Sequence, residues 1–144
     1  MRTKTLLSHD DVAAMLAAAK DEALRNQWPV SIAVCDDGGH LLGFVRLDGA
    51  APMSASIAPA KARSAAMSRR ESRLLEEMIN NGRTAFLSAP GLDGMLEGGI
   101  PIVVDGQCVG AIGVSGVKSI EDAQVAKAGI ATLGRAAGGE AAPH

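Results

Sequence analysis

Apolar and polar positions follow two different periods along the chain. Over residues 8–27 the apolar side chains recur at helical spacing, and this pattern predicts a helix. Ser8 and Asp11 have the spacing of a capping box at its start, and Pro29 ends it. The apolar positions of this helix are Val12, Met15, Leu16, Ala19 and Ala23.

Two hairpins are predicted from shorter apolar runs. Residues 30–36 and 41–47 form the first, joined through Asp36-Asp37-Gly38-Gly39-His40. A two-residue Asp-Gly or Gly-Gly turn is typical here, because these residues tolerate positive φ. The second hairpin turns at Asp105-Gly106, between the sequences IPIVV and QCVGAIGV. Both faces of its strands are apolar, as expected for a central pair that is covered on both sides.

A second helix is predicted to start at Ser54 or Ser56. It is rich in alanine, so we expect it to pack closely on a sheet, and Pro59 fits only in its first turn. A further amphipathic piece follows and ends at Asn80-Asn81-Gly82. Its apolar residues are Leu74, Leu75, Met78 and Ile79.

The rest of the chain contains one long loop and one helix. Residues 83–99 are rich in proline and glycine, and we expect them to be irregular and mobile. Ser119 with Asp122 is predicted to cap a last helix that runs to about residue 137.

The order of elements is therefore α-β-β-α-α-β-β-α. It predicts an α+β fold with a central antiparallel sheet of about four or five strands and helices around it. We expect one domain over residues 1–137 and a disordered tail over residues 138–144.

Composition narrows the class of protein. The chain has 144 residues, a formal net charge of −2 and no tyrosine, which argues against a nucleic-acid binder. Cys35 and Cys108 each lie inside an apolar run, so we expect reduced cysteines and a cytoplasmic location. No apolar run approaches the length that spans a bilayer, so no membrane partner is expected. The abundant alanine and glycine indicate self-association.

The strongest candidate site follows the first hairpin, at Arg46, Asp48, Gly49 and Ala50. A salt bridge or a cap is the structural alternative for Arg46 and Asp48. In the functional interpretation, Gly49 lets the chain turn and the next helix presents free N–H groups, which attract a carboxylate. Lys61 and Arg63 then add positive charge from that helix.

A second loop leaves the equivalent end of the other hairpin. Ser115 and Gly116 belong to the glycine-rich stretch GAIGVSG, which lacks the pattern of a phosphate loop. These glycines are explained by close packing of helix and strand. Alternatively, Ser115-Gly116 supplies backbone donors beside Asp48-Gly49, and the two loops converge on one pocket.

The histidines have both a structural and a functional interpretation. His40 follows the Gly-Gly turn and His9 lies in the first turn of the first helix, so exposed surface residues are the simple explanation. The functional alternative is a metal ligand or a proton carrier. No HxxH, HExxH or CxxC spacing is present, so a dedicated metal site is not predicted.

Four segments in order carry a family resemblance: VCDDGGHLLGFVRLDGA (34–50), Ser56 with APAKA (58–62), GGIPIVVDGQCVGAIGVSG (98–116) and DAQVAKAG (122–129). Together they resemble the GlcG/HbpS-like family, which includes the C-terminal domain of PduO-type proteins. The resemblance covers about residues 6–137. It implies a profilin-like or PAS-like three-layer α/β/α domain that assembles into homo-oligomers, often octamers.

The resemblance also implies function. Some family members bind haem and act in haem degradation or redox sensing, and others accompany catabolic operons. The family pattern places no axial haem ligand in this sequence, and His9 and His40 are the candidates. The motif matches are Asp36, Gly39, Arg46, Asp48, Gly49, Ala50, Lys61, Gly98, Gly99, Pro101, Gly110, Gly113, Ser115 and Gly116.

Three hypotheses follow. The first is a cytoplasmic oligomer that binds haem or another tetrapyrrole, with Arg46, Lys61 or Arg63 pairing with its carboxylates. The second is a cofactor-independent isomerase or tautomerase acting on a small organic acid, in which Asp48 or Lys61 moves a proton. The third is a non-catalytic accessory protein whose assembly is its function.

Overall fold

The computed structural model describes residues 1–136, and its elements follow the predicted order. The predicted tail over residues 138–144 lies outside the described residues. The helices are α1 (His9–Arg25), α2 (Ser54–Ser68), α3 (Ser72–Asn80), the short 3₁₀ helix η1 (Thr84–Ser88) and α4 (Ser119–Ala136). The strands are β1 (Ser31–Asp36), β2 (Leu41–Arg46), β3 (Gly99–Val104) and β4 (Gln107–Ser115).

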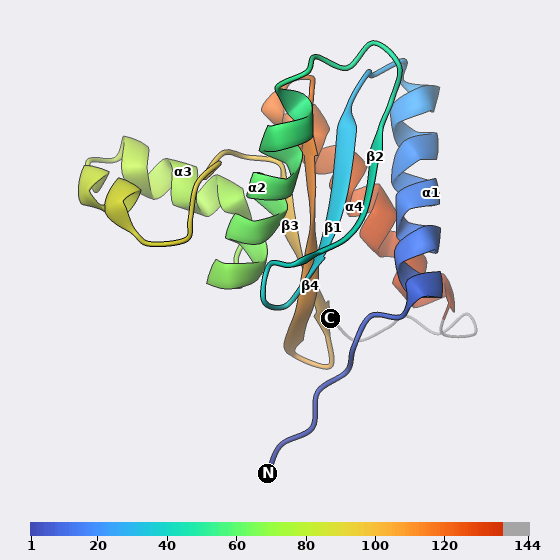
Figure 1. Cartoon of the computed structure of the whole chain (residues 1–144), viewed down its shortest axis with the longest axis horizontal. Coiled ribbons are helices and arrows are strands. Elements are labelled where there is room, and N and C mark those ends of the chain that lie inside the picture. Colours follow the sequence, from blue (N-terminus) through green and yellow to red (C-terminus); the bar gives the residue numbers. More distant parts are fainter. Residues whose placement is uncertain (137–144) are drawn as a thin grey trace.

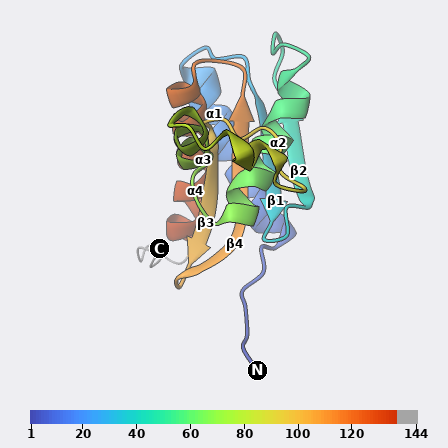
Figure 2. The ribbon, with the colours of Figure 1, turned by 90° about the vertical axis from the view of Figure 1, so that its left-hand side faces the viewer.

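In the described part of the chain, these four strands form one antiparallel sheet in the order β2-β1-β4-β3. Helices α1 and α4 pack on one face and α2 on the other, which gives the three-layer α+β fold that the sequence predicts (Figure 1). Helix α3 and η1 project outward beyond α2 (Figures 1 and 2). The prediction that both strands of the second hairpin are central was wrong, because only β4 is central and β3 is an edge.

The two faces of the sheet have different side chains. Along β1, Ile32 and Val34 face α1 and α4, whereas Ala33 and Cys35 face α2. The α1–α4 side is filled by branched residues and Met15. The α2 side is built from small residues, since alanines of the helix meet Ala33, Cys35 and Ala111. This composition brings the axis of α2 close to the sheet.

The start of α1 was predicted correctly. The Ser8 hydroxyl accepts a hydrogen bond from the Asp11 N–H at 3.1 Å, and the Asp11 carboxylate accepts one from the Ser8 N–H at 2.8 Å. Together they satisfy two of the free N–H groups of the first turn. The capping motif therefore fixes where α1 begins.

The first hairpin turn differs from the two-residue turn that we predicted. The Gly39 N–H donates to the Asp36 carbonyl, the Asp36 N–H donates to the His40 carbonyl, and Gly39 has φ +82°. This is the three-residue hairpin loop, in which a glycine in the left-handed region follows a tight turn. The Asp36 carboxylate also accepts hydrogen bonds from the Gly38 and His40 N–H groups at 2.9 and 3.0 Å. Asp36 is thus explained by turn chemistry.

Helix α2 begins at Ser54, which is one of the two predicted starts, but its first turn differs from the prediction. Pro59 lies beyond its first turn, since the helix already starts at Ser54. The Ser54 hydroxyl does not cap the helix; it contacts the Ala51 carbonyl at 2.6 Å and the Ser31 hydroxyl of β1 at 2.8 Å. The buried Ser31–Ser54 contact therefore ties the beginning of α2 to the sheet.

The cap of α4 also differs from the prediction. The Lys118 N–H donates to the Glu121 carboxylate at 3.2 Å, so Glu121 and not Asp122 takes the capping role. The Asp122 carboxylate is buried and accepts from the Val117 N–H at 3.2 Å. Its second oxygen is available for another partner, which is Lys61.

The segment 83–98 is less irregular than expected, since it contains η1. Its carbonyls are tied to α2 and α3: Arg63 Nε donates to the Gly91 carbonyl at 2.8 Å and Ser64 Oγ to the Asp93 carbonyl at 2.7 Å. Ser72 Oγ donates to the Leu96 carbonyl. These contacts hold the segment against α2 and α3.

Candidate functional site

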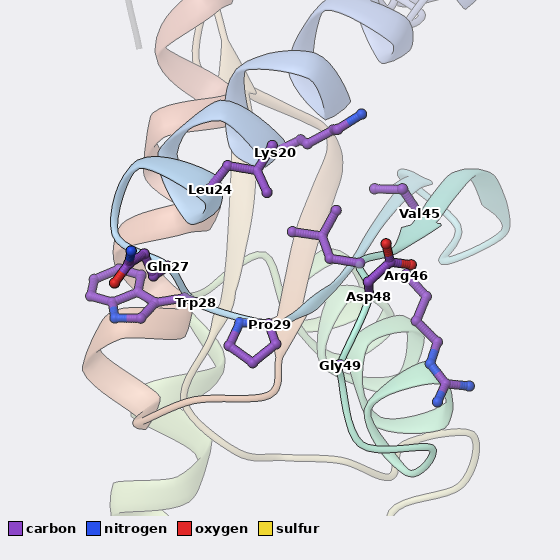
Figure 3. A pocket seen from close by; sticks show the side chains of 10 residues that line it. Lys20, Leu24, Gln27, Trp28, Pro29, Val45, Arg46, Asp48 and Gly49 are labelled. Carbon is purple, nitrogen blue, oxygen red and sulfur yellow. The ribbon is translucent and has the colours of Figure 1, made fainter.

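One cleft in the described residues has a volume of about 610 Å³ and lies where α1 ends and β2 ends. Figure 3 shows it from close by. Its walls come from two segments that are adjacent in space and not in sequence. The lining residues are Lys20, Leu24, Gln27, Trp28, Pro29, Val45, Arg46, Leu47, Asp48 and Gly49.

Backbone turns shape one wall of this cleft. Helix α1 ends with Gln27 in the left-handed region, at φ 61°, and the Trp28 N–H donates back to the Ala23 carbonyl. This reversal turns the chain into β1 and leaves Trp28 packed against the core. Pro29 then lies on the cleft wall.

The other wall is the segment that follows β2. The Leu47 N–H donates to the Val30 carbonyl, and its side chain is buried, so this residue anchors the segment. Gly49 then has φ +86°, a conformation that glycine adopts without strain. The chain turns here and Asp48 is left exposed beside the cleft.

Three charged side chains line the cleft. The Arg46 guanidinium donates to the Ala50 carbonyl at 2.9 Å and extends away from Lys20 (Figure 3). Lys20, Arg46 and Asp48 are exposed. Within residues 1–136 none of the three makes an ion pair, so the salt-bridge alternative for Arg46 and Asp48 has no support in the geometry. Their charges are therefore available to a ligand.

Lys61 lies apart from this cleft. It is buried in α2, and its ammonium donates to the Asp122 carboxylate at 3.0 Å and to the Val114 carbonyl at 2.9 Å. A Cβ on Gly98 would lie 2.8 Å from Nζ, so the glycine leaves the space that the ammonium fills. Burial raises the pKa of Asp122, and the neighbouring Lys61 ammonium opposes this rise.

This placement bears on the acid–base hypothesis. In that hypothesis Asp48 or Lys61 moves a proton at the substrate. The Lys61 side chain is buried against β4 and α4, whereas Asp48 lines the cleft. The two residues therefore do not share a site in this structure. Lys61 instead joins α2 to β4 and α4.

Arg63 also lies elsewhere. Its Nε binds the Gly91 carbonyl, and a Cβ on Gly39 would lie 2.8 Å from its Cγ, so its side chain spans from the β1–β2 turn to the 83–98 segment. Neither Gly39 nor Gly91 lines the cleft. Arg63 is thus not a lining residue.

The predicted convergence of the two loops is partly present. Ser31 pairs with both Arg46 and Ser115 in register, so these residues form one row across the sheet. A Cβ on Gly116 would lie 2.5 Å from the Pro29 carbonyl, so this loop runs against the back of the cleft wall. However, neither Ser115 nor Gly116 lines the cleft, and neither does Ala50.

The histidines are exposed and lie outside the cleft. The His40 side chain is 77% exposed, with Nδ1 3.3 Å from the Asp36 carboxylate. Slight burial acts to raise the pKa of Asp36, but the hydrogen bonds from the His40 and Gly38 N–H groups outweigh it and lower that pKa. His9 is almost fully exposed at the start of α1. In the described residues no His, Cys, Asp and Glu side chains gather as a metal site.

A second cleft, of about 360 Å³, lies between α3 and the segment after η1. It is mostly apolar and was not predicted from the sequence. Its lining residues are Glu76, Ile79, Asn80, Leu87, Leu92, Asp93, Gly94, Met95 and Leu96. Its apolar character suits packing against another apolar surface.

Sequence reasoning found the β2 side of the larger cleft and missed the α1 side. The sequence analysis treated the segment with Lys20, Leu24 and Gln27 only as the end of a helix. It considered Trp28 only as one of the few aromatic residues. One signal for the α1 side was available in the sequence: Trp28 stands directly before Pro29, which follows the predicted helix. A large side chain at this point must pack beside the strand that comes next.

The family described as "Haem degrading protein HbpS-like" matches residues 7–131. The chain belongs to this family. Among the relatives of this HbpS-like protein, Protein GlcG of Escherichia coli strain K12 is 57% identical over 115 residues, which are 80% of this chain and 85% of GlcG. The family resemblance carried by the four sequence segments is therefore confirmed.

Solved structures agree with this assignment. A double mutant of HbpS from Streptomyces reticuli is 32% identical, with a TM-score of 0.84 over 92% of this chain and 90% of HbpS. A complex of PduOC with haem is 26% identical, with a TM-score of 0.82 over 88% of this chain and 94% of PduOC. The HbpS-like fold is thus shared with a domain that has been crystallised with haem.

No helix within the described range is both long and apolar enough to cross a membrane.

Proposed function

We propose that this HbpS-like protein binds a small carboxylate-bearing molecule in the cleft between the end of α1 and the end of β2. The observation that carries the proposal is that Lys20 and Arg46 line a partly apolar cleft without a carboxylate partner among the described residues. Leu24, Trp28 and Pro29 supply the apolar wall. A cation beside apolar surface suits an organic anion, because the carboxylate and the hydrocarbon part are both accommodated.

Asp48 adds selectivity to this cleft. Its carboxylate can only accept hydrogen bonds when it is ionised, so it favours a ligand that carries a donor group such as a hydroxyl. A hydroxy acid therefore suits the cleft better than a dicarboxylate, which Asp48 would repel. Both cysteines are free, and Cys35 is buried, which supports a reducing compartment such as the cytoplasm.

Trp28 provides the test, since it is the single tryptophan and lines the cleft. Titration with mandelate, which carries a carboxylate, a hydroxyl and an aromatic ring, should change its fluorescence to saturation. Lys20→Ala should weaken binding about tenfold, because one charged contact is lost. Lys127→Ala, which removes an exposed lysine of α4, is the matched control and should leave the affinity unchanged.

The neutral amide of mandelate separates charge recognition from apolar binding. We expect it to bind more weakly than the acid to the unaltered protein, and equally to the unaltered protein and to Lys20→Ala. Equal binding of acid and amide by the unaltered protein would show that the carboxylate is not recognised.

Haem is the second candidate ligand, and the likeness to the PduOC complex with haem supports it. Lys20 and Arg46 suit the propionates, but the lining of the cleft includes no His, Cys, Met or Tyr, the usual axial ligands. Burial also raises the pKa of Cys35 to about 12, which disfavours its thiolate. The residues of this cleft therefore suit the edge of haem and do not suit its iron.

Titration with hemin tests this candidate. We expect a saturable change of the Soret band with quenching of Trp28, and weaker binding by Lys20→Ala. His9→Ala is the control for surface histidines and should bind hemin normally. Absence of a saturable Soret change would remove haem from the candidate ligands. The mandelate titration would then be the test of whether the cleft binds a ligand.

A further inference from the structure

The cleft of about 360 Å³ between α3 and the segment after η1 is separate from the proposed ligand cleft at the end of α1. Helices α3 and α1 lie on opposite sides of α2 and the sheet (Figure 1). The volume is in the range of sites for small molecules. The large apolar side chains of its lining are Ile79, Leu87, Leu92, Met95 and Leu96. This cleft can therefore hold the hydrocarbon part of a small ligand.

Hydrogen bonds hold the wall of this cleft that faces α3. Ser72 Oγ of α3 donates to the Leu96 carbonyl, and Ser64 Oγ of α2 donates to the Asp93 carbonyl at 2.7 Å. Both contacts fix the backbone of the segment that supplies most of the lining. A cleft with fixed walls binds a ligand at a lower cost in ordering.

The charged side chains of this cleft are both acidic. Glu76 on α3 and Asp93 on the facing wall line it, and neither forms an ion pair within residues 1–136. Glu76 Oε1 accepts a hydrogen bond from the Glu97 N–H at 3.1 Å, which holds the carboxylate in place. Among the described residues, the lining contains no lysine, arginine or histidine. The cleft therefore combines uncompensated negative charge with apolar surface.

Asn80 adds a polar group beside Glu76. Residues four apart on a helix lie on the same face, so these two side chains are neighbours along α3. A primary ammonium carries three N–H donors and no acceptor, and the two carboxylates with the Asn80 side-chain oxygen are acceptors. Hydrogen bonds between two charged groups are stronger than those between neutral groups. The polar part of the cleft therefore suits an ammonium better than a hydroxyl.

We propose that this second cleft binds a small primary amine that carries an aromatic or other hydrocarbon group. The ammonium binds Glu76 and Asp93, and the hydrocarbon part contacts the leucines and Met95. An aromatic group is favoured because a thioether sulfur makes favourable contacts with rings. This inference concerns a second site and a ligand of opposite charge. It goes beyond the proposed carboxylate site and does not depend on it.

Titration of ¹⁵N-labelled protein with phenethylamine, followed by NMR, tests the site. The amide signals of residues 76–80 and 92–96 should shift to saturation, and the indole signal of Trp28 should not. The neutral 2-phenylethanol has a hydroxyl in place of the ammonium and should bind about tenfold more weakly. Mandelate, an anion, should leave the signals of α3 unchanged. Absence of saturable shifts in α3, or equal affinity for the amine and the alcohol, would overturn the proposal.

Two carboxamide variants test the charges. Glu76→Gln keeps an oxygen for the Glu97 N–H, and Asp93→Asn alters an exposed side chain, so both should fold. Each should weaken phenethylamine binding about tenfold, because one charged contact is lost. Glu77→Gln is the matched control, since this carboxylate of α3 pairs with Arg73 and does not line the cleft. Unchanged affinity in both lining variants, or an equal loss in Glu77→Gln, would overturn the assignment.

Leu87→Ala tests the apolar part of the cleft. Leu87 is 63% exposed, so its truncation should leave the fold intact and weaken phenethylamine binding about threefold. Leu74→Ala, in an exposed residue of α3 outside the lining, should not weaken it. Equal affinities of these two variants would contradict the placement of the ring. Lys20→Ala should bind phenethylamine normally and Glu76→Gln should bind mandelate normally, so the two proposed sites fail separately.

Discussion

Replacing Lys61 with methionine should lower the free energy of unfolding by about 3–5 kcal/mol, because it leaves a buried carboxylate without its partner. The Lys61 ammonium is the only cation that contacts Asp122 among the described residues, at 3.0 Å, and both side chains are almost fully buried. The Val114 carbonyl also loses its hydrogen bond from this ammonium. Urea denaturation followed by circular dichroism measures the change.

A double variant shows whether the charge causes the loss. Lys61→Met/Asp122→Asn removes the unpaired charge and keeps an oxygen for the Val117 N–H, so it should recover at least half of the lost stability. Lys127→Ala removes an exposed lysine whose ion pair with Glu71 spans 3.9 Å, and should cost about 0–1 kcal/mol. An equal loss in the single and double variants would assign the effect to packing.

The effect of pH has a definite sign. In Lys61→Met the buried Asp122 carboxyl has a pKa above its unfolded value of 3.8, so the folded state binds more protons than the unfolded state. Stability then falls as pH rises above that value until the folded pKa is passed. The deficit of Lys61→Met relative to the unaltered protein should therefore shrink when the urea experiment is moved from neutral to acidic pH.

Local sequence signals predicted the elements well where the signal acts within a few residues. The Ser8–Asp11 box fixes the start of α1, and Asp105-Gly106 gives a two-residue turn with both φ values positive. Gly39 was placed in a turn correctly, although the turn is one residue longer than predicted. These features depend on backbone conformation and on neighbours along the chain.

The roles of Lys61 and Asp122 could not be predicted in this way. A lysine in an alanine-rich helix suggests an exposed cation, and an aspartate three residues after a serine suggests a cap. Their contact joins residues 61 positions apart, so it depends on how α2 and α4 lie across β4. The cleft has the same origin, since its α1 wall and its β2 wall meet only after the sheet has formed. The sequence therefore predicted a charged site and could not decide which charges share it.

Gly113→Ala should destabilise the protein by about 3 kcal/mol or more, because the added methyl group overpacks the contact between α2 and β4. A Cβ at Gly113 would lie 2.1 Å from the Ala58 carbonyl oxygen and 2.4 Å from the Ala62 nitrogen. Both are backbone atoms of α2, so no side-chain rotation relieves the clash, and the helix must move off the sheet. The measurement is urea denaturation of the variant.

Two further variants separate this steric effect from other effects of glycine. In Gly38→Ala the tight contact is with the His40 side chain, at 3.1 Å, which is exposed and can move, and the Asp36 carboxylate lies at an ordinary 3.5 Å, so the variant should cost about 1 kcal/mol or less. Adding Ala62→Gly to Gly113→Ala should not restore stability, since the clash is with backbone. Recovery by Ala62→Gly would mean that side chains and not the helix backbone set the spacing of α2 from the sheet.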